Sequence, residues 1–336
     1  MKKLNLTKAK KRTIIIAVIT AVVVLAIIIT NIFIPVKYLS SYLVARNKGA
    51  DIGVMRVRFV DVGYGDCIIV ELPDGKNMVI DAGEDTSSNQ KRILKFLNKC
   101  DIDTIDYLVC TSVSKEHCAG LSELLNYKKV KRVFMPYCKN TYVTKEFRNF
   151  AVALTGINAD CVVSQYGTGE SNDGSGYFFT FLSPSVITNP GSQYEGLIGT
   201  PSKEQIDAAS AVMWLEYCGT SFLLTSDATD EVLNSLCKYY ENDKDNFARN
   251  GNHTVKLENC NVLQVANHGG EASASSLLYD LTKPETAVIS VGENGFGCPS
   301  VQAISNAVNY VGDKLYRTDE HGTVTIEVTS AGYAVK

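Results

Sequence analysis

The sequence predicts an α/β protein in which two sheets pack together with helices outside, preceded by one transmembrane helix. Two observations support this prediction. An uncharged, strongly apolar run lies near the N-terminus, and in the chain that follows it strand-like and helix-like segments alternate. The strand-then-helix order occurs twice, once in each half, which is typical of layered α/β domains. A chain of 336 residues holds one large domain or two ordinary ones.

Apolar periodicity locates the individual elements, with period 2 or short continuous runs for strands and period 3.6 for helices. The expected strands lie at 56–61, 67–72, 78–80, 107–110, 131–135, 177–182, 211–217, 221–225, 261–266, 286–291 and 323–328. The expected helices lie at 89–99, 119–126, 229–240, 273–281 and 300–311. Segments 166–176 and 183–205 are rich in Gly, Ser, Asn and Pro and are expected to be surface loops.

Residues 13–36 form the membrane anchor in this prediction. The run has no charged residue, and at roughly 1.5 Å per residue a helix of this length exceeds the roughly 30 Å hydrocarbon core of a bilayer. A cleaved signal peptide is the alternative, but its apolar region is usually shorter and ends in a small-x-small site. The sequence before Pro35 offers no such site.

Basic residues in front of the anchor predict its orientation. Residues 1–12 hold no acidic residue and six basic ones, which are Lys2, Lys3, Lys8, Lys10, Lys11 and Arg12. The positive-inside rule therefore places residues 1–12 in the cytoplasm and exports the C-terminal part. We expect residues 37–54 to form a juxtamembrane connector, in which 38–47 can extend the helix, and residues 55–336 to form the extracytoplasmic domain at the cell membrane.

The exported part is acidic. The whole chain has a net charge of −3, so without the six N-terminal positive charges the remainder carries −9. Strong nucleic-acid binding is not expected, because affinity for polyanions comes largely from Lys and Arg on phosphates. Lys128, Lys129, Lys131 and Arg132 are the one candidate basic patch, and the plainer interpretation is that they solvate a turn before a strand.

Ten cysteines leave the redox chemistry open. Their spacing is scattered, with no CxxC, and several, such as Cys67, Cys110 and Cys218, lie in or beside apolar runs. Buried thiols that act as small hydrophobes are expected. One or two disulfides are the alternative in an exported domain, and the sequence does not determine their pairing.

Seven motifs, in order, resemble the ComEC-type metallo-β-lactamase domains of competence proteins. They are 61–67 (DVGYGDC), 79–83 (VIDAG), 107–121 (YLVCTSVSKEHCAGL), 222–228 (FLLTSDA), 262–270 (VLQVANHGG), 287–292 (AVISVG) and 316–323 (YRTDEHGT). The resemblance covers nearly the whole exported domain and implies the αββα sandwich of that family. It also implies a hydrolase ancestry in which metal-bound hydroxide attacks an ester or phosphodiester, as in single-strand DNA degradation.

Departures from the family pattern fall on the metal ligands. Where the family has His-x-His-x-Asp-His, this chain has Ser112, Ser114, Glu116 and His117. The later His-His has become Asn267-His268, and a His-bearing stretch has become Gly297-Cys298-Pro299-Ser300. Hydroxyl groups are poor neutral ligands for zinc. A standard two-zinc site is therefore not expected.

The surviving residues match one metal position. By resemblance, Glu116, His117 and His268 belong to the second position, and Asp227 is the carboxylate that can bridge both. This set is legitimate for one zinc or another divalent ion. We expect at most one ion, held by Glu116, His117, Asp227 and His268, with Asp227 and His268 as the catalytic pair. The alternative is that no metal binds and these residues persist as inert hydrogen-bonding groups.

Other residues are weaker candidates. Cys298 can replace an imidazole as a thiolate ligand, but a buried thiol is the plainer interpretation. Ser112 lacks the elbow sequence and the orienting acid that a nucleophilic serine needs. Asp61, Asp66 and Asp81 are expected to brace the loops, with Asp66 or Asp81 supporting a metal ligand.

Two function classes remain open. Because most zinc-ligand histidines are missing, the sequence favours a non-catalytic binding or scaffolding module, a pseudoenzyme that keeps the fold. The alternative is a one-metal hydrolase acting on an ester or phosphodiester. One span does not make the polytopic channel of full-length competence proteins, so DNA uptake by this chain alone is not expected.

Overall fold

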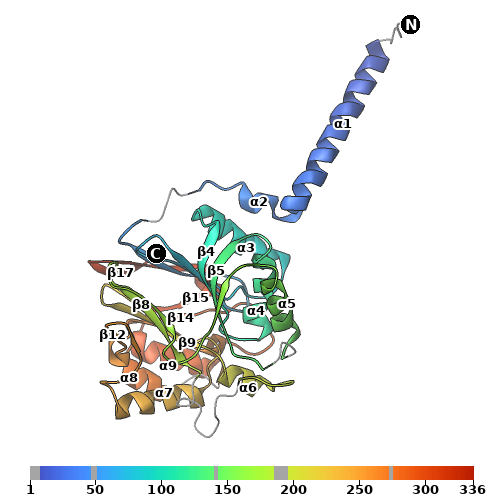
Figure 1. Ribbon diagram of the computed structural model, residues 1–336. Coiled ribbons are helices and arrows are strands. Elements are labelled where there is room, and N and C mark those ends of the chain that lie inside the picture. The colour runs from blue at the N-terminus through green and yellow to red at the C-terminus, as the bar shows by residue number, and fades with distance from the viewer. Residues whose placement is uncertain (1–7, 47–50, 140–142, 185–195, 272–274) are drawn as a thin grey trace.

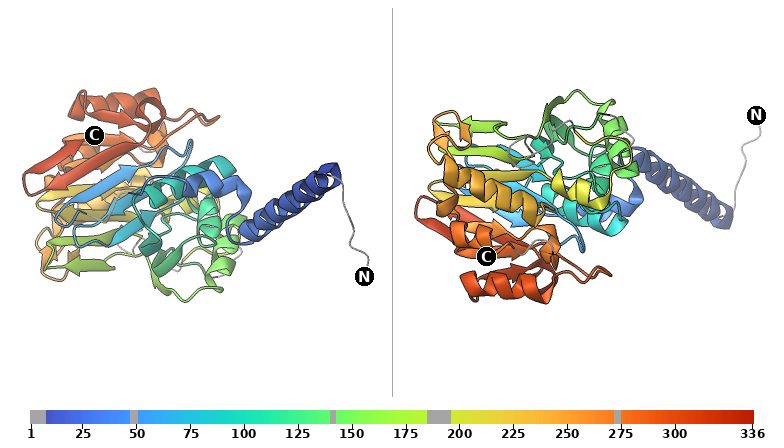
Figure 2. Two further views of the ribbon diagram at one scale, coloured as in Figure 1. Left: turned by 90° about the horizontal axis from the view of Figure 1, so that it is seen from above. Right: turned by 90° about the horizontal axis from the view of Figure 1, so that it is seen from below.

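The computed structural model describes residues 8–46, 51–139, 143–184, 196–271 and 275–336. Two large sheets face each other, and helices cover the outer side of each sheet (Figures 1 and 2). A long apolar helix projects from this body. The predicted metallo-β-lactamase-type αββα sandwich behind one N-terminal helix is confirmed in its layers and order.

The first sheet has eight strands and mixes two pairing modes. Strands from β17 to β3 pair antiparallel, and β3, β4, β5 and β6 pair parallel. In spatial order the strands are β17 (Gly332–Val335), β16 (Val324–Thr329), β1 (Met55–Phe59), β2 (Ile68–Glu71), β3 (Asn77–Ile80), β4 (Thr104–Val109), β5 (Lys129–Met135) and β6 (Asp160–Val163).

The second sheet has seven strands. Its antiparallel strands come first in the sequence and its parallel strands come later. Strands β15, β14, β13 and β10 pair parallel, and β10, β9, β8 and β7 pair antiparallel. The strands are β15 (Leu315–Arg317), β14 (Thr286–Ile289), β13 (Val262–Gln264), β10 (Thr220–Leu224), β9 (Val212–Tyr217), β8 (Tyr177–Ser183) and β7 (Gly169–Asn172). A small hairpin joins β11 (Arg249–Asn250) to β12 (His253–Thr254).

Helices pack on the outer face of each sheet because each has one apolar side. On α3, for example, Ile93, Leu94 and Leu97 are buried while the intervening lysines are exposed. The first sheet carries α3 (Ser87–Lys99), α4 (Lys115–Leu124) and α5 (Lys145–Leu154). The second carries α7 (Asp230–Asn242), α8 (Ser276–Thr282) and α9 (Val301–Val311). Shorter elements are α6 (Lys203–Ala208), α10 (Thr318–His321), η2 (Leu257–Asn259) and η3 (Asn267–Gly269).

The core lies between the sheets and is built from their inward-facing side chains. Phe59 and Phe134 from the first sheet meet Phe179 and Phe222 from the second, and all four are almost completely buried. At about 25 cal/mol per Å² of apolar area, aromatic side chains of this size supply a large share of the stability. Two further apolar clusters join each sheet to its own helices. This sandwich holds the loops at the strand ends in fixed positions.

The apolar helix α1 (Lys8–Phe33) contains a stretch, Lys10–Ile29, that is long and apolar enough to cross a membrane. None of that stretch is buried inside the protein. The predicted segment boundaries at residues 12, 36 and 54 stay predictions, because a membrane is needed to define them.

The connector does not extend α1 as the sequence prediction allowed. After Pro35 the chain turns through η1 (Val36–Tyr38) and α2 (Leu39–Tyr42) and packs on the domain. Tyr38 is buried, donates to Glu123 Oε1 at 2.9 Å and meets the Tyr127 ring edge-on. Burial of Tyr38 stabilises this folded-back path more than a continued helix in solvent can.

Several elements were missed or misplaced by the sequence prediction. Segment 166–176, expected to be a loop, contains the edge strand β7, whose Gly, Ser and Asn residues pair with β8 despite low strand propensity. Helix α5 and strands β6, β15 and β17 were not anticipated. Residues 185–195 of the second expected loop lie outside the described residues, and α6 begins at Lys203 near its end.

All ten cysteines are free thiols in the structure. Six are buried, in agreement with the expectation of small apolar side chains, and they are Cys67, Cys100, Cys110, Cys118, Cys237 and Cys260. Cys218 departs from it, because it lies exposed in the tight turn between β9 and β10, with a φ of 49°.

Gly120 sets the distance between α4 and the loop after β3. A Cβ atom there would lie 2.1 Å from the carbonyl oxygen of Ala82 and 2.5 Å from Gln90 Nε2. We expect Gly120→Ala to lower the free energy of unfolding by about 2 kcal/mol, although alanine favours helix. Chemical denaturation checks this. The control Gly295→Ala, at a position with open space around it, should change stability by less than about 0.5 kcal/mol. Equal stabilities for the two variants would contradict the close packing.

Candidate metal centre

Loops at one end of the two sheets bring the candidate ligands together. Asp81 follows β3, and His117 lies in the first turn of α4, after β4. Asp227 follows β10, and His268 lies in η3, after β13. These strands belong to the parallel parts of their sheets, where all carboxyl ends point to the same edge. Ligand sites in α/β proteins are commonly formed at this edge.

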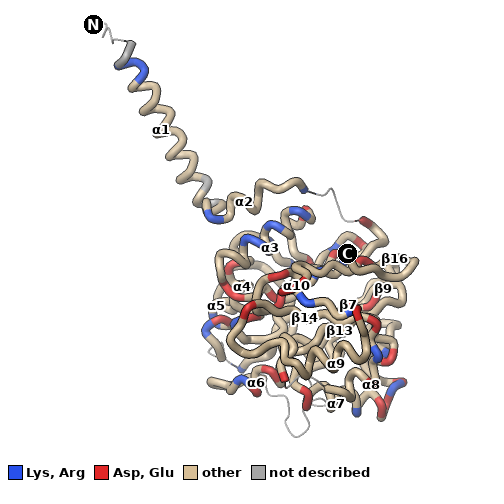
Figure 3. The backbone as a smooth tube through the Cα atoms, turned by 180° about the vertical axis from the view of Figure 1, so that it is seen from behind, with Lys and Arg blue, Asp and Glu red and all other residues tan. Residues whose placement is uncertain are grey.

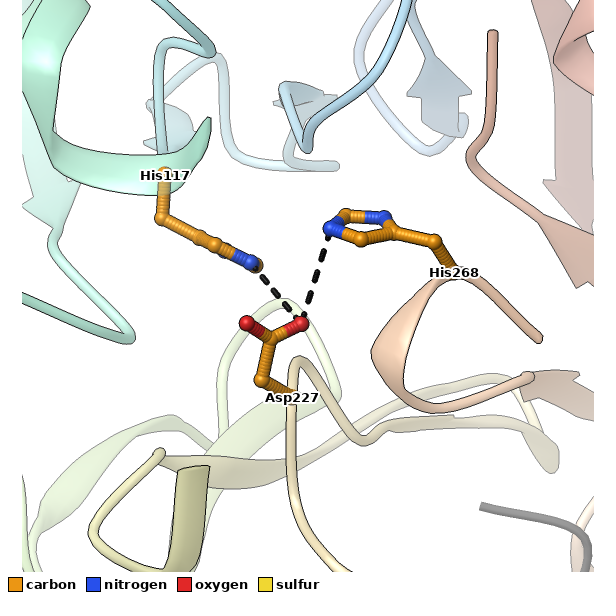
Figure 4. Close-up of side chains that lie close together, drawn as sticks. All are labelled: His117, Asp227 and His268. Atoms are coloured by element: carbon orange, nitrogen blue, oxygen red, sulfur yellow. Dashed lines mark ion pairs between the residues drawn. The ribbon is translucent and has the colours of Figure 1, made fainter. Parts of the chain in front are cut away.

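Three of the four predicted ligand residues lie together. One ligand atom from each of His117, Asp227 and His268 lies within 4.8 Å of the others, and all three residues are buried. The Nε2 atoms of His117 and His268 are 3.0 Å and 3.6 Å from Asp227 Oδ1. The His117 ring extends from α4 and the His268 ring from η3, and both point toward the Asp227 carboxylate (Figure 4).

The other nitrogen of each imidazole has a fixed partner. His117 Nδ1 lies 2.8 Å from Asp81 Oδ2, and His268 Nδ1 lies 2.8 Å from the carbonyl oxygen of Ser290. A carbonyl oxygen only accepts, so His268 carries its proton on Nδ1 and a neutral ring presents a lone pair on Nε2. The Asp81 carboxylate favours the same tautomer in His117. Such partners commonly orient metal-binding histidines.

The atoms that converge make no hydrogen bonds. Among the described residues, His117 Nε2, His268 Nε2 and both carboxylate oxygens of Asp227 are buried without a hydrogen-bond partner. His117 Nε2 and Asp227 Oδ1 are close enough for one, but they are not aligned for it. Buried polar atoms without partners are costly. A cation between them would satisfy all four atoms, so the donor set fits a divalent metal ion.

Charges in this cluster are strongly coupled. Burial disfavours the charged form of His117, but Asp227 and Asp81 outweigh it and raise the pKa of His117 well above its usual value. Burial likewise opposes ionisation of Asp227, yet His117 and His268 lower the pKa of Asp227 far below the usual range. The carboxylate is therefore ionised and needs positive charge beside it. A divalent ion can provide that charge in place of imidazole protons.

Asp66 forms a second layer behind the imidazoles. It accepts a hydrogen bond from Gln264 Nε2 at 2.7 Å and lies 3.7 Å from His117 Nδ1 and 3.9 Å from His268 Nδ1. Burial raises the pKa of Asp66. Its loop is held close to α4, because a Cβ on Gly65, whose φ is 134°, would lie 2.4 Å from the carbonyl oxygen of Glu116.

Strained backbone surrounds the cluster. Four non-glycine residues there have positive φ angles: Asp81 (57°), Ser226 (48°), Asn267 (46°) and His268 (53°). Such conformations cost roughly 1–3 kcal/mol each and persist where surrounding contacts require them. Asp81 is held by Thr111, whose backbone N–H donates to Asp81 Oδ1 at 2.8 Å and whose hydroxyl bonds Oδ2. Ser226 Oγ in turn lies 2.6 Å from Thr111 Oγ1.

Glu116, the fourth predicted ligand, does not join the cluster. It is half-buried in α4. Among the described residues, its carboxylate belongs neither to the group of His117, Asp227 and His268 nor to a second group of ligand-type atoms from Asp66, Asp81 and His117. Its role as a ligand stays a prediction.

The positions that lost histidines hold no substitute cluster in the described part of the chain. Ser112 is buried and accepts from the Ser114 N–H at 3.3 Å, while Ser114 Oγ is buried without a partner. Cys298 is half-buried, with Sγ 3.9 Å from the carbonyl oxygen of Asn267. These contacts give no second metal position made of several ligands.

Sequence reasoning missed several supporting groups. Thr111, Gln264 and the Ser290 carbonyl were not identified, and neither was Tyr64, whose ring lies 4.5 Å from that of His268. One signal was present: Gln264 is a polar residue inside the otherwise apolar run 262–266 and is buried. The role of the Ser290 carbonyl could not be predicted, because every residue has the same backbone carbonyl group.

Comparison with solved structures agrees with this architecture. A variant of the CmlA β-hydroxylase superposes with a TM-score of 0.50 at 16% sequence identity, over 81% of this chain and 53% of that one. The metallo-β-lactamase fold protein YhfI from Bacillus subtilis covers 80% of this chain and 98% of its own, with a TM-score of 0.45 and 10% identity. The layers and strand order described above are those of the metallo-β-lactamase fold.

A sequence comparison gives the more specific relationship. No protein-family model matches the chain. ComE operon protein 3 of Bacillus subtilis (strain 168) is 24% identical over an alignment of 283 residues, and the match covers 80% of this chain and 32% of that protein. The chain thus spans about a third of the length of this relative. The resemblance to ComEC-type metallo-β-lactamase domains is confirmed.

The hydrogen bond from His117 to Asp81 should control metal affinity. Asparagine tolerates the left-handed backbone of Asp81 but removes its charge, so we expect Asp81→Asn to weaken zinc binding about 10–100-fold. Titration against a chelating dye measures this. The control is Asp61→Asn, which lies in the loop after β1 and is paired with Arg92 at 2.7 Å, and this variant should bind zinc normally. Unchanged affinity in Asp81→Asn would contradict this role.

Proposed function

We propose that this chain is a membrane-anchored metallo-β-lactamase-fold hydrolase that uses one divalent metal ion on an ester or phosphodiester. One observation carries the proposal. The buried Nε2 atoms of His117 and His268 converge at ion-pair distance on the Asp227 carboxylate, and none of these atoms has a hydrogen-bond partner. Two imidazoles and one carboxylate match hydrolytic zinc sites, in which a fourth position is left for water.

The residues around this point have separable roles. His117, Asp227 and His268 would hold the ion, which when bound would act as a Lewis acid and lower the pKa of a bound water. Asp81 and the Ser290 carbonyl keep the proton on each Nδ1, so that both Nε2 lone pairs stay directed at the same point. Protonated imidazoles keep Asp227 ionised by lowering its pKa, and the charge of a bound ion would do the same once the rings are neutral.

Lys203 adds positive charge on the side of α6. It pairs with Asp207 at 2.9 Å, and its charge acts on Asp227 and on Cys298. Asp207 Oδ2 also lies 3.5 Å from Asn267 Nδ2, next to His268. A phosphodiester carries negative charge. Because Asp207 balances part of the Lys203 charge, we assign Lys203 a supporting role in substrate attraction.

A non-catalytic module is the second candidate. Ser112 and Ser114 stand where the family has two histidines, and no described residues rebuild that position. In this alternative, the protonated His117 and Asp227 form an ion pair that stabilises a binding or scaffolding domain. The strained backbone at Asp81 and His268 weighs against it, because selection for stability alone tends to remove such strain.

We do not assign the whole activity of ComE operon protein 3 to this chain. This chain matches 32% of ComE operon protein 3, and its exported part is acidic. We propose that nucleic-acid binding is weak and that the membrane is the constant partner, with DNA uptake outside the reach of this chain alone.

Metal analysis separates the two candidates. We expect the full chain, purified in detergent and loaded with zinc, to retain about one equivalent and to hydrolyse a chromogenic phosphodiester or ester. His268→Ala should lose both the metal and the hydrolysis, falling to the uncatalysed background. Cys298→Ala is the matched control from the same region and should keep both. Two equivalents would show a rebuilt first position, and no metal with normal folding would support the non-catalytic module.

Topology is tested in intact cells. Six basic residues precede the anchor, so we expect the N-terminus inside and the domain outside. Protease added to intact cells should remove the domain, while a tag placed before residue 1 stays protected. A protected domain, or a mature N-terminus near residue 37, would contradict the orientation or the uncleaved anchor.

A further inference from the structure

The basic patch that the sequence indicated is not free. Lys128 is buried and bonds Asn98 Oδ1 at 2.7 Å, Lys131 pairs with Asp106 at 2.6 Å, and Arg132 pairs with Asp160 at 2.8 Å. Lys128 also pairs with Asp103, so these three cations are neutralised by their own neighbours, while exposed Lys129 has no ion pair in the described part of the chain. The three paired cations therefore offer little charge to an external anion.

A different basic surface lies on α3. Lys91, Lys95 and Lys99 recur every four residues, so they follow one side of the helix. All three are exposed, and none has an ion pair in the described part of the chain. We call these three residues the α3 lysine stripe. A groove of about 330 Å³ lies along the same helix, and Lys95, Lys99 and Arg92 contribute to its wall.

The folded-back connector places this stripe beside the anchor. Ser41 Oγ donates to the Lys91 carbonyl oxygen at 3.1 Å, and Asn98 Nδ2 donates to the Ser41 carbonyl oxygen at 2.8 Å. Arg46 then pairs with Asp101 and Asp103, at 2.8 Å and 2.9 Å, just after α3 ends. Figure 3 shows the basic residues of α3 next to α2, at the end of the domain from which α1 leaves.

The outer side of the connector is apolar. While Tyr38 and Ser41 face the domain, Val36, Leu39 and Leu43 are 52%, 42% and 76% exposed. Exposed apolar side chains next to a row of lysines have the composition of segments that lie in a membrane interface. The α3 helix packs directly on this connector. Its diameter of about 10–12 Å is close to the Debye length of about 8 Å at physiological salt, so a membrane surface at the connector lies within reach of the lysine charges on α3.

We infer that the α3 lysine stripe binds the anionic phospholipid headgroups of the membrane that α1 spans, and so fixes the orientation of the domain on that membrane. This inference rests on the membrane anchoring in the proposed function and not on its chemistry. Short helix α6, which carries Lys203, lies at the end of the domain away from α1 in both Figures 1 and 3. Headgroup binding by α3 thus keeps the α6 side turned toward the aqueous phase.

Lysine footprinting tests the inference on the full chain. The protein is placed in nanodiscs of phosphatidylcholine alone or mixed with phosphatidylglycerol, acetylated briefly, and analysed by mass spectrometry. One lysine near an anionic surface contributes a factor of about five to binding. We expect Lys91, Lys95 and Lys99 to react at least about fivefold more slowly in the anionic discs, with the difference removed at about 0.5 M salt. Exposed Lys238 and Lys314 should react equally in both discs.

A charge-reversal pair sharpens the test. Lys91→Glu with Lys99→Glu leaves Lys95 as the reporter, and its reaction rate in anionic discs should approach the rate in neutral discs. The control pair Lys238→Glu with Lys314→Glu should leave Lys95 protected. Equal reactivity of the α3 lysine stripe in both lipids overturns the inference. Protection that requires added single-stranded DNA, in neutral discs, overturns it in favour of a nucleic-acid ligand. A chain that does not co-elute with discs contradicts the anchoring instead.

Discussion

The ionised carboxylate of Asp227 is fully buried, and the surrounding structure is arranged to compensate its charge. An isolated buried carboxylate is strongly unfavourable, so positive charge must lie beside it. His117 and His268 supply the nearest groups, and each is held from behind, by Asp81 and by the Ser290 carbonyl oxygen. The result is a point surrounded by two imidazole nitrogens and a carboxylate. Either imidazole protons or a metal ion can satisfy it.

The geometry favours the metal ion for a specific reason. An ion pair that had evolved only for stability would align donor and acceptor, as Asp81 and His117 do at 2.8 Å. On the other side of the same ring, His117 Nε2 lies 3.0 Å from Asp227 Oδ1 without that alignment. His268, whose backbone φ is 53°, places its Nε2 atom 3.6 Å from the same oxygen. Both Nε2 atoms meet the Asp227 carboxylate at ion-pair distance and converge on a shared point.

Much of this architecture was predictable from the sequence. The long apolar helix α1 followed from an uncharged apolar run, and the sandwich from alternating strand and helix patterns supported by seven motifs in order. The same motifs identified His117, Asp227 and His268, which the structure brings together. Motif matching does not predict the direction of the Glu116 carboxylate, because that direction depends on one extra methylene group and on the local turn of α4.

Other features depend on tertiary contacts that one sequence does not express. Edge strands such as β7 form because a neighbouring strand offers hydrogen bonds, whatever their propensity. The connector folds back because Tyr38 finds a buried site against Tyr127 and Glu123, residues distant in sequence. The α3 lysine stripe acquires meaning only once this contact places it beside the anchor.

X-ray absorption spectroscopy of the zinc-loaded protein tests the central claim most directly, because it reports the atoms around the ion. A site made by His117, Asp227 and His268 predicts nitrogen and oxygen neighbours at about 2.0–2.2 Å, with the scattering pattern of two imidazoles. A sulfur neighbour at about 2.3 Å would show that Cys298 or another thiol is a ligand. A second metal at about 3.5–4 Å would show a two-metal centre. Either result would contradict a single ion held by two histidines and one aspartate.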